Sequence, residues 1–447
     1  MKKLHTLFFL TLAGTFVFAQ SQDSTFQFSV KQAIDFAMQN QKDVLNAGLD
    51  AEIAAHKVKE TIGIGLPQIS ANLDVKDYEK IPVSLVPAEF FGGEQGEFVP
   101  IQFGTKWNAT AGVSASQLIF DPSYLVGVSA SRTYKELSYK NLDRTKLETA
   151  IAVTKAYYAV LLSREAKKVL EANQTRLEKL SFDTKAMYEN GFVEKIDADR
   201  VKVAYNNIKI ENENYARTME ISERMLRFQM GLPQNANLIL TDSIDQDLVK
   251  KIQIPDERSD ATKRIEYSIL KTSERLQEYN LKRYKRQYFP SLVAYGSLNT
   301  MAQRTEFNFF DSQYGWYPTG VIGATLSFNL FDGTQREQRI RQEKLALRKI
   351  GNEIVNFENS ASLEASASRS KLKNALESLK VQDENLQLAN SVSNTTKLKY
   401  QQGVGSNIEV LDSETSLLEA QVNYFTALYN AVVAKIDLDR ALGNFTY

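Results

Sequence analysis

The feature that most limits the fold of this chain is a pair of very long segments that lack helix-breaking residues. Pro122 to Asn190 spans 69 positions and Gly333 to Gln402 spans 70, with no proline after Pro122 and almost no glycine. At 1.5 Å per residue, a helix over either segment would reach about 100 Å. We therefore predict long helices over 122–190 and 333–402, packed side by side with other helices in an elongated bundle.

A shorter predicted helix follows each long one, over 195–230 and 406–443. In the second of these, the spacing of mostly apolar residues alternates between three and four positions over four heptads, which is typical of a helix packed along its length against other helices. We call this set the 408–436 stripe. Its members are Ile408, Leu411, Thr415, Leu418, Val422, Phe425, Tyr429, Val432 and Ile436.

Four other segments alternate apolar residues with small polar ones, which is the two-residue period of a β-strand. In the first segment Ile69 and Leu73 lie on one face, and Ser70 lies on the other. The first two segments are separated by a long predicted loop, 78–106. Aromatic residues near the strand ends are typical of a membrane interface, and a soluble half-buried sheet is the alternative. The predicted strands are 68–77, 107–120, 291–300 and 320–331.

The two halves of the chain share motifs at a constant offset. Tyr188 and Gly191 match Tyr400 and Gly403, and 400 − 188 = 403 − 191 = 212. The equal spacing is expected of a rod of fixed length, so we interpret the halves as two structural repeats. The predicted domains are a first repeat over 20–231, a linker over 232–260 and a second repeat over 261–447.

The first 19 residues have the pattern of a secretory signal peptide. Lys2 and Lys3 precede an apolar stretch from Leu4 to Phe18, and Ala19 suits a cleavage site. The mature chain is therefore expected outside the cytoplasm. No later stretch of about 18 apolar residues follows, so a membrane crossing by the mature chain would require strands closed into a barrel.

Composition removes several classes of function. The chain has no cysteine, which excludes disulfides, thiolate metal sites and lipid attached to a cysteine. The 54 Lys plus Arg balance the 54 Asp plus Glu, so no basic surface for nucleic acid is expected. Of the two histidines, His5 lies in the predicted signal peptide and His56 is interpreted as a polar helix residue. We predict no catalytic residue, cofactor or metal, and no enzyme.

Four strands cannot close a transmembrane barrel alone, because the smallest such barrels have eight. Two copies would supply eight strands around a lumen filled by side chains, whereas three copies would supply twelve around a water-filled bore. The small polar faces of the predicted strands suit a water-filled bore. The expected fold is therefore mainly α with a small β part, and three copies complete a 12-stranded β-barrel.

In their order and spacing, these segments resemble the TolC-like outer membrane efflux proteins over essentially the whole mature chain. The resemblance is carried by Leu66-Pro67-Gln68, by the glycine hairpins 188–196 and 400–412, and by the closing motif 438–443. It implies a homotrimer whose barrel lies in the outer membrane and whose antiparallel helices form a tunnel through the periplasm. It further implies a passive exit duct of a tripartite efflux or type I secretion system, with a periplasmic adaptor and an inner-membrane pump of the RND, ABC or MFS type.

The same resemblance assigns candidate site residues. The family usually carries a small hydroxyl residue at the position of Ser406 in the second tip. Glu194, which occupies the equivalent position in the first tip, departs from that pattern. Residues 391–402 contain no Asp or Glu, so an acidic gate is not supported, and Asn394 and Lys397 are the candidates for a tunnel constriction. The linker is expected to form a belt around the waist of the tunnel. The adaptor-contacting tips are Gly191, Phe192, Val193, Glu194, Gly403, Val404, Gly405 and Ser406.

Two other classes of protein compete with this interpretation. A periplasmic coiled-coil scaffold or adaptor without a pore would explain the long helices, but it leaves the four two-faced strands without a role. A secreted hydrolase would require a catalytic residue that no motif in the sequence suggests. The sequence does not identify the transported substrate.

Overall fold

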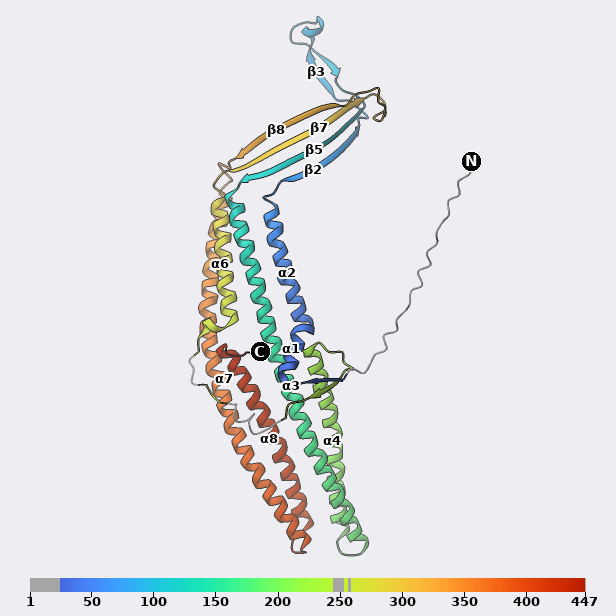
Figure 1. The fold of residues 1–447 in the computed structure, drawn as a ribbon, viewed down its shortest axis with the longest axis vertical. Helices are drawn as coiled ribbons and strands as arrows, with labels where there is room; N and C mark the ends of the chain where they lie inside the picture. Colours follow the sequence, from blue (N-terminus) through green and yellow to red (C-terminus); the bar gives the residue numbers. More distant parts are fainter. Residues whose placement is uncertain (1–24, 244–252, 256–258, 447) are drawn as a thin grey trace, which may run out of the picture.

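The computed structural model describes residues 25–243, 253–255 and 259–446 of the chain. The predicted signal peptide, 1–19, lies outside the described residues, as does part of the predicted linker. The described chain is a long rod with a β-sheet near one end and helical tips at the other (Figure 1). Among the described residues, no helix combines the length and the apolar character that a membrane crossing requires.

Two unbroken helices run from the sheet to the opposite end of the rod. They are α3 (Pro122–Glu189, 68 residues) and α7 (Gln335–Gln401, 67 residues). The start of α3 is capped by Asp121, whose side chain accepts hydrogen bonds from the backbone N–H groups of Ser123 and Tyr124. The shorter helices are α1 (Val30–Asn40), α2 (Lys42–Gly63), α4 (Lys195–Met230), α6 (Ile265–Arg286) and α8 (Asn407–Leu442).

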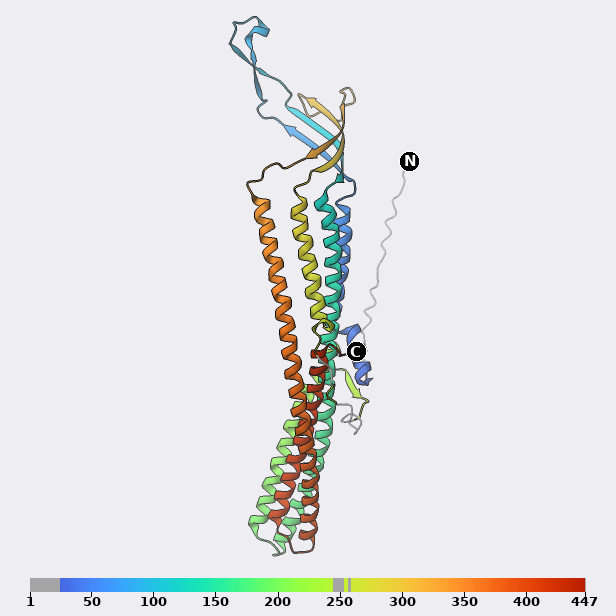
Figure 2. The ribbon, with the colours of Figure 1, turned by 90° about the vertical axis from the view of Figure 1, so that its left-hand side faces the viewer.

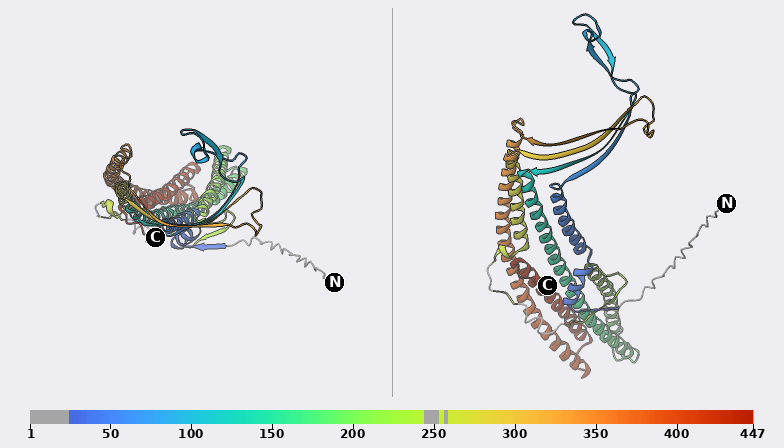
Figure 3. Two further views of the ribbon diagram at one scale, coloured as in Figure 1. Left: turned by 90° about the horizontal axis from the view of Figure 1, so that it is seen from above. Right: turned by 45° about the horizontal axis from the view of Figure 1, so that its top comes forward.

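The helices form one curved layer. Next to the sheet the order across the layer is α2, α3, α6 and α7, and in the other half of the rod it is α4, α3, α8 and α7. The shorter helices therefore form two interrupted lines, α2 with α4 and α6 with α8, beside the continuous α3 and α7 (Figure 1). Figure 2 shows α6 above α8 from a second direction. Seen along the rod, the layer is concave on one side (Figure 3).

A small parallel sheet lies at the middle of the rod. Its strands are β1 (Thr25–Phe28) and β6 (Asn237–Leu240). The fully buried Tyr157 of α3 donates a hydrogen bond of 3.0 Å to the Phe28 carbonyl, which fixes this sheet against the long helix. A single turn of 3₁₀ helix, η2 (Ala261–Lys263), then leads into α6.

The sheet at the end of the rod has four antiparallel strands in the order β2-β5-β7-β8. Their bounds differ from the predicted ones mainly in the second half, where β7 is longer and β8 ends earlier. β8 ends at Ser327 because that residue pairs with Ser291, the first residue of β7. Beyond it the buried Arg336 holds the chain, since its guanidinium donates to the Asn329 carbonyl at 2.8 Å and to the Asp332 carboxylate at 2.6 Å. The strands are β2 (Gln68–Asp77), β5 (Trp107–Phe120), β7 (Ser291–Arg304) and β8 (Tyr317–Ser327).

The segment expected to be a loop, 78–106, contains a β-hairpin, so that prediction is wrong. Strand β3 (Val83–Pro87) pairs with β4 (Phe98–Gln102), and a 3₁₀ turn, η1 (Ala88–Phe91), follows β3. Apolar residues occupy both faces of these strands, so the sequence lacks the alternation that marks the other four. The hairpin projects beyond the four-stranded sheet (Figure 1).

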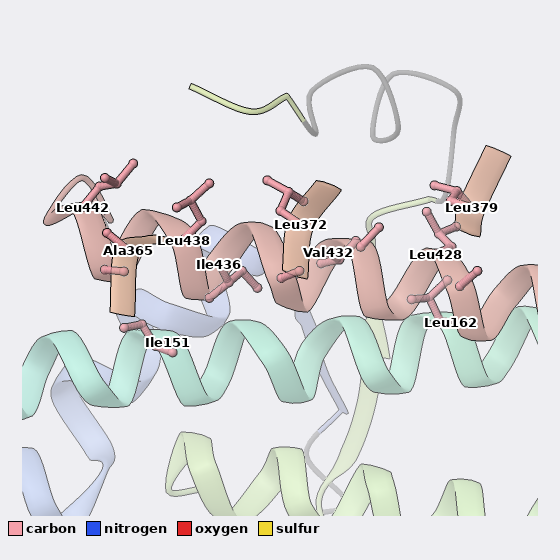
Figure 4. Close-up of a cluster of buried hydrophobic side chains, with 14 residues drawn as sticks. Ile151, Leu162, Ala365, Leu372, Leu379, Leu428, Val432, Ile436, Leu438 and Leu442 are labelled. Carbon is pink, nitrogen blue, oxygen red and sulfur yellow. The ribbon is translucent and has the colours of Figure 1, made fainter. Parts of the chain in front are cut away.

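The main hydrophobic core lies where α3, α7 and α8 meet (Figure 4). Leu372 and Leu379 of α7 pack there with Leu428 and Val432 of α8. Within the single chain, only the last two members of the 408–436 stripe are buried, whereas Ile408 is exposed. The difference arises because α8 contacts α7 on one face and α3 on another, so its buried residues do not follow a single stripe.

Candidate functional site

The register of the four-stranded sheet aligns most of the apolar residues of its four strands on one face. In the described pairing, Leu73 lies opposite Ala111, Val113 lies opposite Leu298, and Gly296 lies opposite Ile322. Paired residues share a face, and alternate residues along each strand return to it. The apolar face is made of Ile69, Ala71, Leu73, Val75, Ala109, Ala111, Val113, Ala115, Leu292, Ala294, Gly296, Leu298, Ala302, Gly320, Ile322, Ala324 and Leu326.

Most of this apolar face is not covered by the rest of the described chain; the exception is the end where Ala109 and Ala302 are buried together with Phe309. Ile322 is 96% exposed and Leu73 is 72% exposed, and Ile69 is similarly open. The opposite face carries mostly small polar residues; for example, Ser70 and Ser114 share a hydrogen bond of 2.8 Å across β2 and β5. A contiguous exposed apolar face of this extent marks a surface that contacts lipid or another protein.

Both edges of the sheet lack a strand partner within the described chain. β2 pairs only with β5, and β8 pairs only with β7. The unpaired backbone N–H and C=O groups of an edge strand are a template for pairing with another chain. Because the sheet has an even number of antiparallel strands, β8 of one copy would run antiparallel to β2 of a second copy.

The first helical tip is a glycine turn between α3 and α4. Gly191 has φ 76°, a conformation that glycine adopts without steric cost. The N–H of Phe192 donates to the Met187 carbonyl at 2.8 Å, which closes the end of α3. Phe192 itself is 77% exposed, so it is available for contact with a partner.

The second tip, between α7 and α8, repeats this geometry. Gly403 has φ 73°, and the N–H of Val404 donates to the Lys399 carbonyl at 3.0 Å. Val404 is 79% exposed. The two turns differ at the start of the next helix, because Ser406 caps α8 through a 3.3 Å bond from the Glu409 N–H.

Two contacts bring the tips together. The Tyr400 hydroxyl lies 3.7 Å from the Met187 sulfur, and the Asn407 side-chain amide donates to the Asp197 carbonyl at 3.4 Å. Glu194, in contrast to Ser406, begins α4 without a side-chain hydrogen bond. The eight predicted tip residues thus lie at one end of the rod (Figure 1). Their contact with an adaptor stays a prediction.

The two constriction candidates have different surroundings. Asn394 is exposed, whereas Lys397 forms an ion pair of 2.5 Å with Glu414 of α8. The charge of Lys397 is therefore balanced inside the chain. Their role in a constriction stays a prediction.

Glu414 is the centre of a polar network that the sequence analysis did not identify. Its side chain is 4% exposed and accepts hydrogen bonds from Arg176 at 2.9 Å and from Ser393 at 2.6 Å, in addition to Lys397. Arg176 also donates to Asn173. One carboxylate therefore joins α3, α7 and α8 close to the tips.

The network keeps the carboxylate ionised. Burial acts to raise the pKa of Glu414, but the hydrogen bonds from Lys397, Ser393 and Arg176 outweigh burial and hold the pKa below its ordinary value. A polar pair, Ser413 and Glu414, interrupts the contact face of α8, which is apolar from Leu417 onward. The sequence could have indicated a buried polar site at this interruption, but it does not identify the residues that bind Glu414.

The described residues contain no group of three or more His, Asp or Glu side chains arranged to hold a metal ion. The features that stand out in the described chain are the exposed apolar face, the two free edges and the paired tips.

The comparisons with known proteins agree with this architecture. The family model described as outer membrane efflux protein matches residues 270–444. The outer membrane protein TolC of Vibrio cholerae is 18% identical over 346 residues, which cover 75% of this chain and 77% of that protein. These matches confirm the resemblance to the TolC-like outer membrane efflux protein family.

Solved structures share the fold along nearly the whole chain. CusC, whose structures concern transmembrane channel formation, has a TM-score of 0.73 at 14% identity and covers 94% of this chain and 93% of its own. The CmeC outer membrane channel of Campylobacter jejuni has a TM-score of 0.73 at 15% identity and covers 93% of this chain and 86% of its own. The mainly α fold with a smaller β part is thus shared with outer membrane channels.

Proposed function

We propose that the protein is the outer membrane channel of a tripartite efflux or type I secretion system, and that it acts as a passive exit duct. The observation that carries the proposal is the four-stranded sheet with one exposed apolar face, one small polar face and two free edges. Such a sheet can be stable in a membrane only when its edges are paired and its apolar face meets lipid.

Three copies would satisfy these requirements. Pairing of β8 with β2 of the next copy gives a closed ring of twelve antiparallel strands, wide enough for a water-filled bore. The apolar face then meets lipid and the small polar face lines the bore. The contacts between copies are heterologous, and a threefold rotation closes them into a ring.

The helical layer would continue the tube into the periplasm. Its curvature is consistent with a wall segment, and its outer members, α7 and the α2–α4 line, would meet in neighbouring copies. Exposed apolar residues on these helices, such as Leu388 and Ile210, support such a contact. The two proposed repeats, 20–231 and 261–447, would then place six similar units around the axis, with the linker as a belt.

The paired tips are the proposed contact for a periplasmic adaptor, which connects the duct to an inner-membrane pump of the RND, ABC or MFS type. The exposed Phe192 and Val404 support this assignment, because both are apolar and neither is covered by the chain. Asn394 and Lys397, three positions apart on one helix face, are proposed to narrow the tunnel above the second tip.

The test of the ring uses the absence of cysteine in the chain. A cysteine fixed at Leu73 of β2 is combined with single cysteines scanned from Thr319 to Ser327 of β8, and disulfides between copies are detected by non-reducing electrophoresis of outer membranes. Crosslinks to the cysteine at position 73 should form at one position of β8 and at the positions two residues away from it, which share its face. A cysteine at Val113 of β5, which already has two partner strands, is the matched control.

Failure of every β2–β8 pair to crosslink, together with a monomer in detergent, would refute the duct. A periplasmic scaffold would instead appear in the soluble periplasmic fraction. Substitution of Val404 by Asp should abolish export while leaving the β2–β8 crosslink intact, and Asn423→Asp, an exposed change on α8, is its control. Normal export by Val404→Asp would contradict the tip assignment.

A further inference from the structure

We propose that the β3–β4 hairpin is an interaction surface between copies of this chain, and that the hairpins of neighbouring copies pack on one another over the mouth of the bore. The inference rests on the proposed ring of three copies. It concerns residues 83–102, which form the two strands and the turn between them.

The strands of the hairpin carry apolar residues on both faces. The register places Leu85 and Pro100 on one face, and Val86 and Val99 on the other. Strands β3 and β4 contain no charged residue. A hairpin exposed to water usually has one polar face. Because both faces of this hairpin are apolar, we expect both to be buried against another surface.

The chain itself does not cover them. Within residues 83–102 only Ala88 is buried, whereas Leu85 is 67% exposed and Phe90 is 79% exposed. No described helix or strand packs extensively on the hairpin. An isolated two-stranded hairpin is at best marginally stable in water, so a partner is required to hold its apolar residues.

The direction of the hairpin identifies the partner. Seen along the rod, the hairpin lies over the concave side of the helical layer (Figure 3). In a closed ring the concave side faces the axis, so hairpins from successive copies converge there. Lipid would lie on the opposite, convex side and beside the sheet, whereas the hairpin projects beyond the sheet (Figure 1).

The charged residues of the segment are consistent with this placement. Glu89, Glu94 and Glu97 all lie in the turn region between the strands, and no Lys or Arg occurs in residues 83–102. The acidic groups therefore mark the end that meets water, while the uncharged strands supply the contact between copies. Three apolar hairpins around one axis would narrow the mouth of the bore.

The test uses two single-cysteine variants, Leu85→Cys and Val99→Cys, one on each face of the hairpin strands. Mild oxidation of intact cells should give a crosslinked dimer band, absent from the wild type, with at least one of the two. Gln313→Cys, an exposed position in the loop between β7 and β8 at the same end, is the control and should give no such band. Replacement of residues 83–102 by a short Gly-Ser linker should raise the single-channel conductance in planar bilayers.

The β2–β8 crosslink is measured in parallel, so that loss of the ring is distinguished from loss of the hairpin contact. An intact ring in which neither hairpin variant crosslinks overturns the inference but leaves the duct standing. Equal crosslinking by Gln313→Cys, labelling of the hairpin by a lipid-borne photoprobe, or an unchanged conductance after its replacement would also overturn it.

Discussion

Replacement of Glu414 by Gln would test whether the buried network holds the three helices together near the tips. The substitution keeps the shape of the side chain but removes the charge that balances Arg176 and Lys397. Loss of one partner from a buried ion pair costs about 3–5 kcal/mol. Because these two cations are 35% and 33% exposed and can regain water, we expect a smaller cost of about 2–4 kcal/mol.

The assay is hydrogen exchange of the intact oligomer, followed by mass spectrometry of peptides from 390–417. At about 1.4 kcal/mol per factor of ten, the expected cost corresponds to a loss of protection of roughly 30-fold to 700-fold in this region. Ser393→Ala, which removes one hydrogen bond, should cost about 1 kcal/mol. Glu419→Gln, an exposed change on the same helix, is the matched control. Equal protection in Glu414→Gln and Glu419→Gln would refute the reasoning.

Three further outcomes are expected. Arg336→Met should lower the temperature at which the oligomer dissociates in detergent, because the buried guanidinium binds two backbone carbonyls and a carboxylate; the exposed change Arg341→Met should not, and equal shifts would contradict this role. Gly403→Ala should cost about 1–2 kcal/mol because its φ is 73°, whereas Gly351→Ala, inside α7 and with open space around it, should stabilise its helix by about 0.5–1 kcal/mol; both are read from exchange of their own peptides. Since the pKa of Glu414 is lowered on folding, its stabilisation is present above the ordinary value of 4.5 and is lost as the pH falls below it. Thermal unfolding followed by circular dichroism should therefore lose part of its acid dependence in Glu414→Gln, and an unchanged pH profile would count against the network.

The elements that can be predicted from the sequence are those governed by local rules. Strand β2 begins directly after Pro67, where helix is disfavoured, and its strict alternation assigns each side chain to a face. The tips follow from glycine at Gly191 and Gly403, because each helix ends with a left-handed residue. The two faces of the sheet can also be predicted, because alternate residues of a strand lie on opposite faces and the apolar set identifies one of them.

The features that could not be predicted depend on contacts between distant residues. The end of β8 is set by its register with β7, because Ser327 pairs with Ser291, the first residue of that strand. The β3–β4 hairpin has no alternation to reveal it. Arg176 and Glu414 are 238 positions apart, and only the packing of α3 against α8 brings them together.

The contrast between continuous and interrupted helices has a mechanical consequence. Because α3 and α7 contain no proline hinge between the sheet and the tips, each transmits a displacement at one end along its whole length, as a lever does. The joints between α2 and α4 and between α6 and α8 lie beside the middle of these levers. In the proposed tube, a movement of the tips would therefore be accommodated by small shifts of the shorter helices at these two joints, while the long helices tilt as rigid bodies and the cores packed on them stay intact.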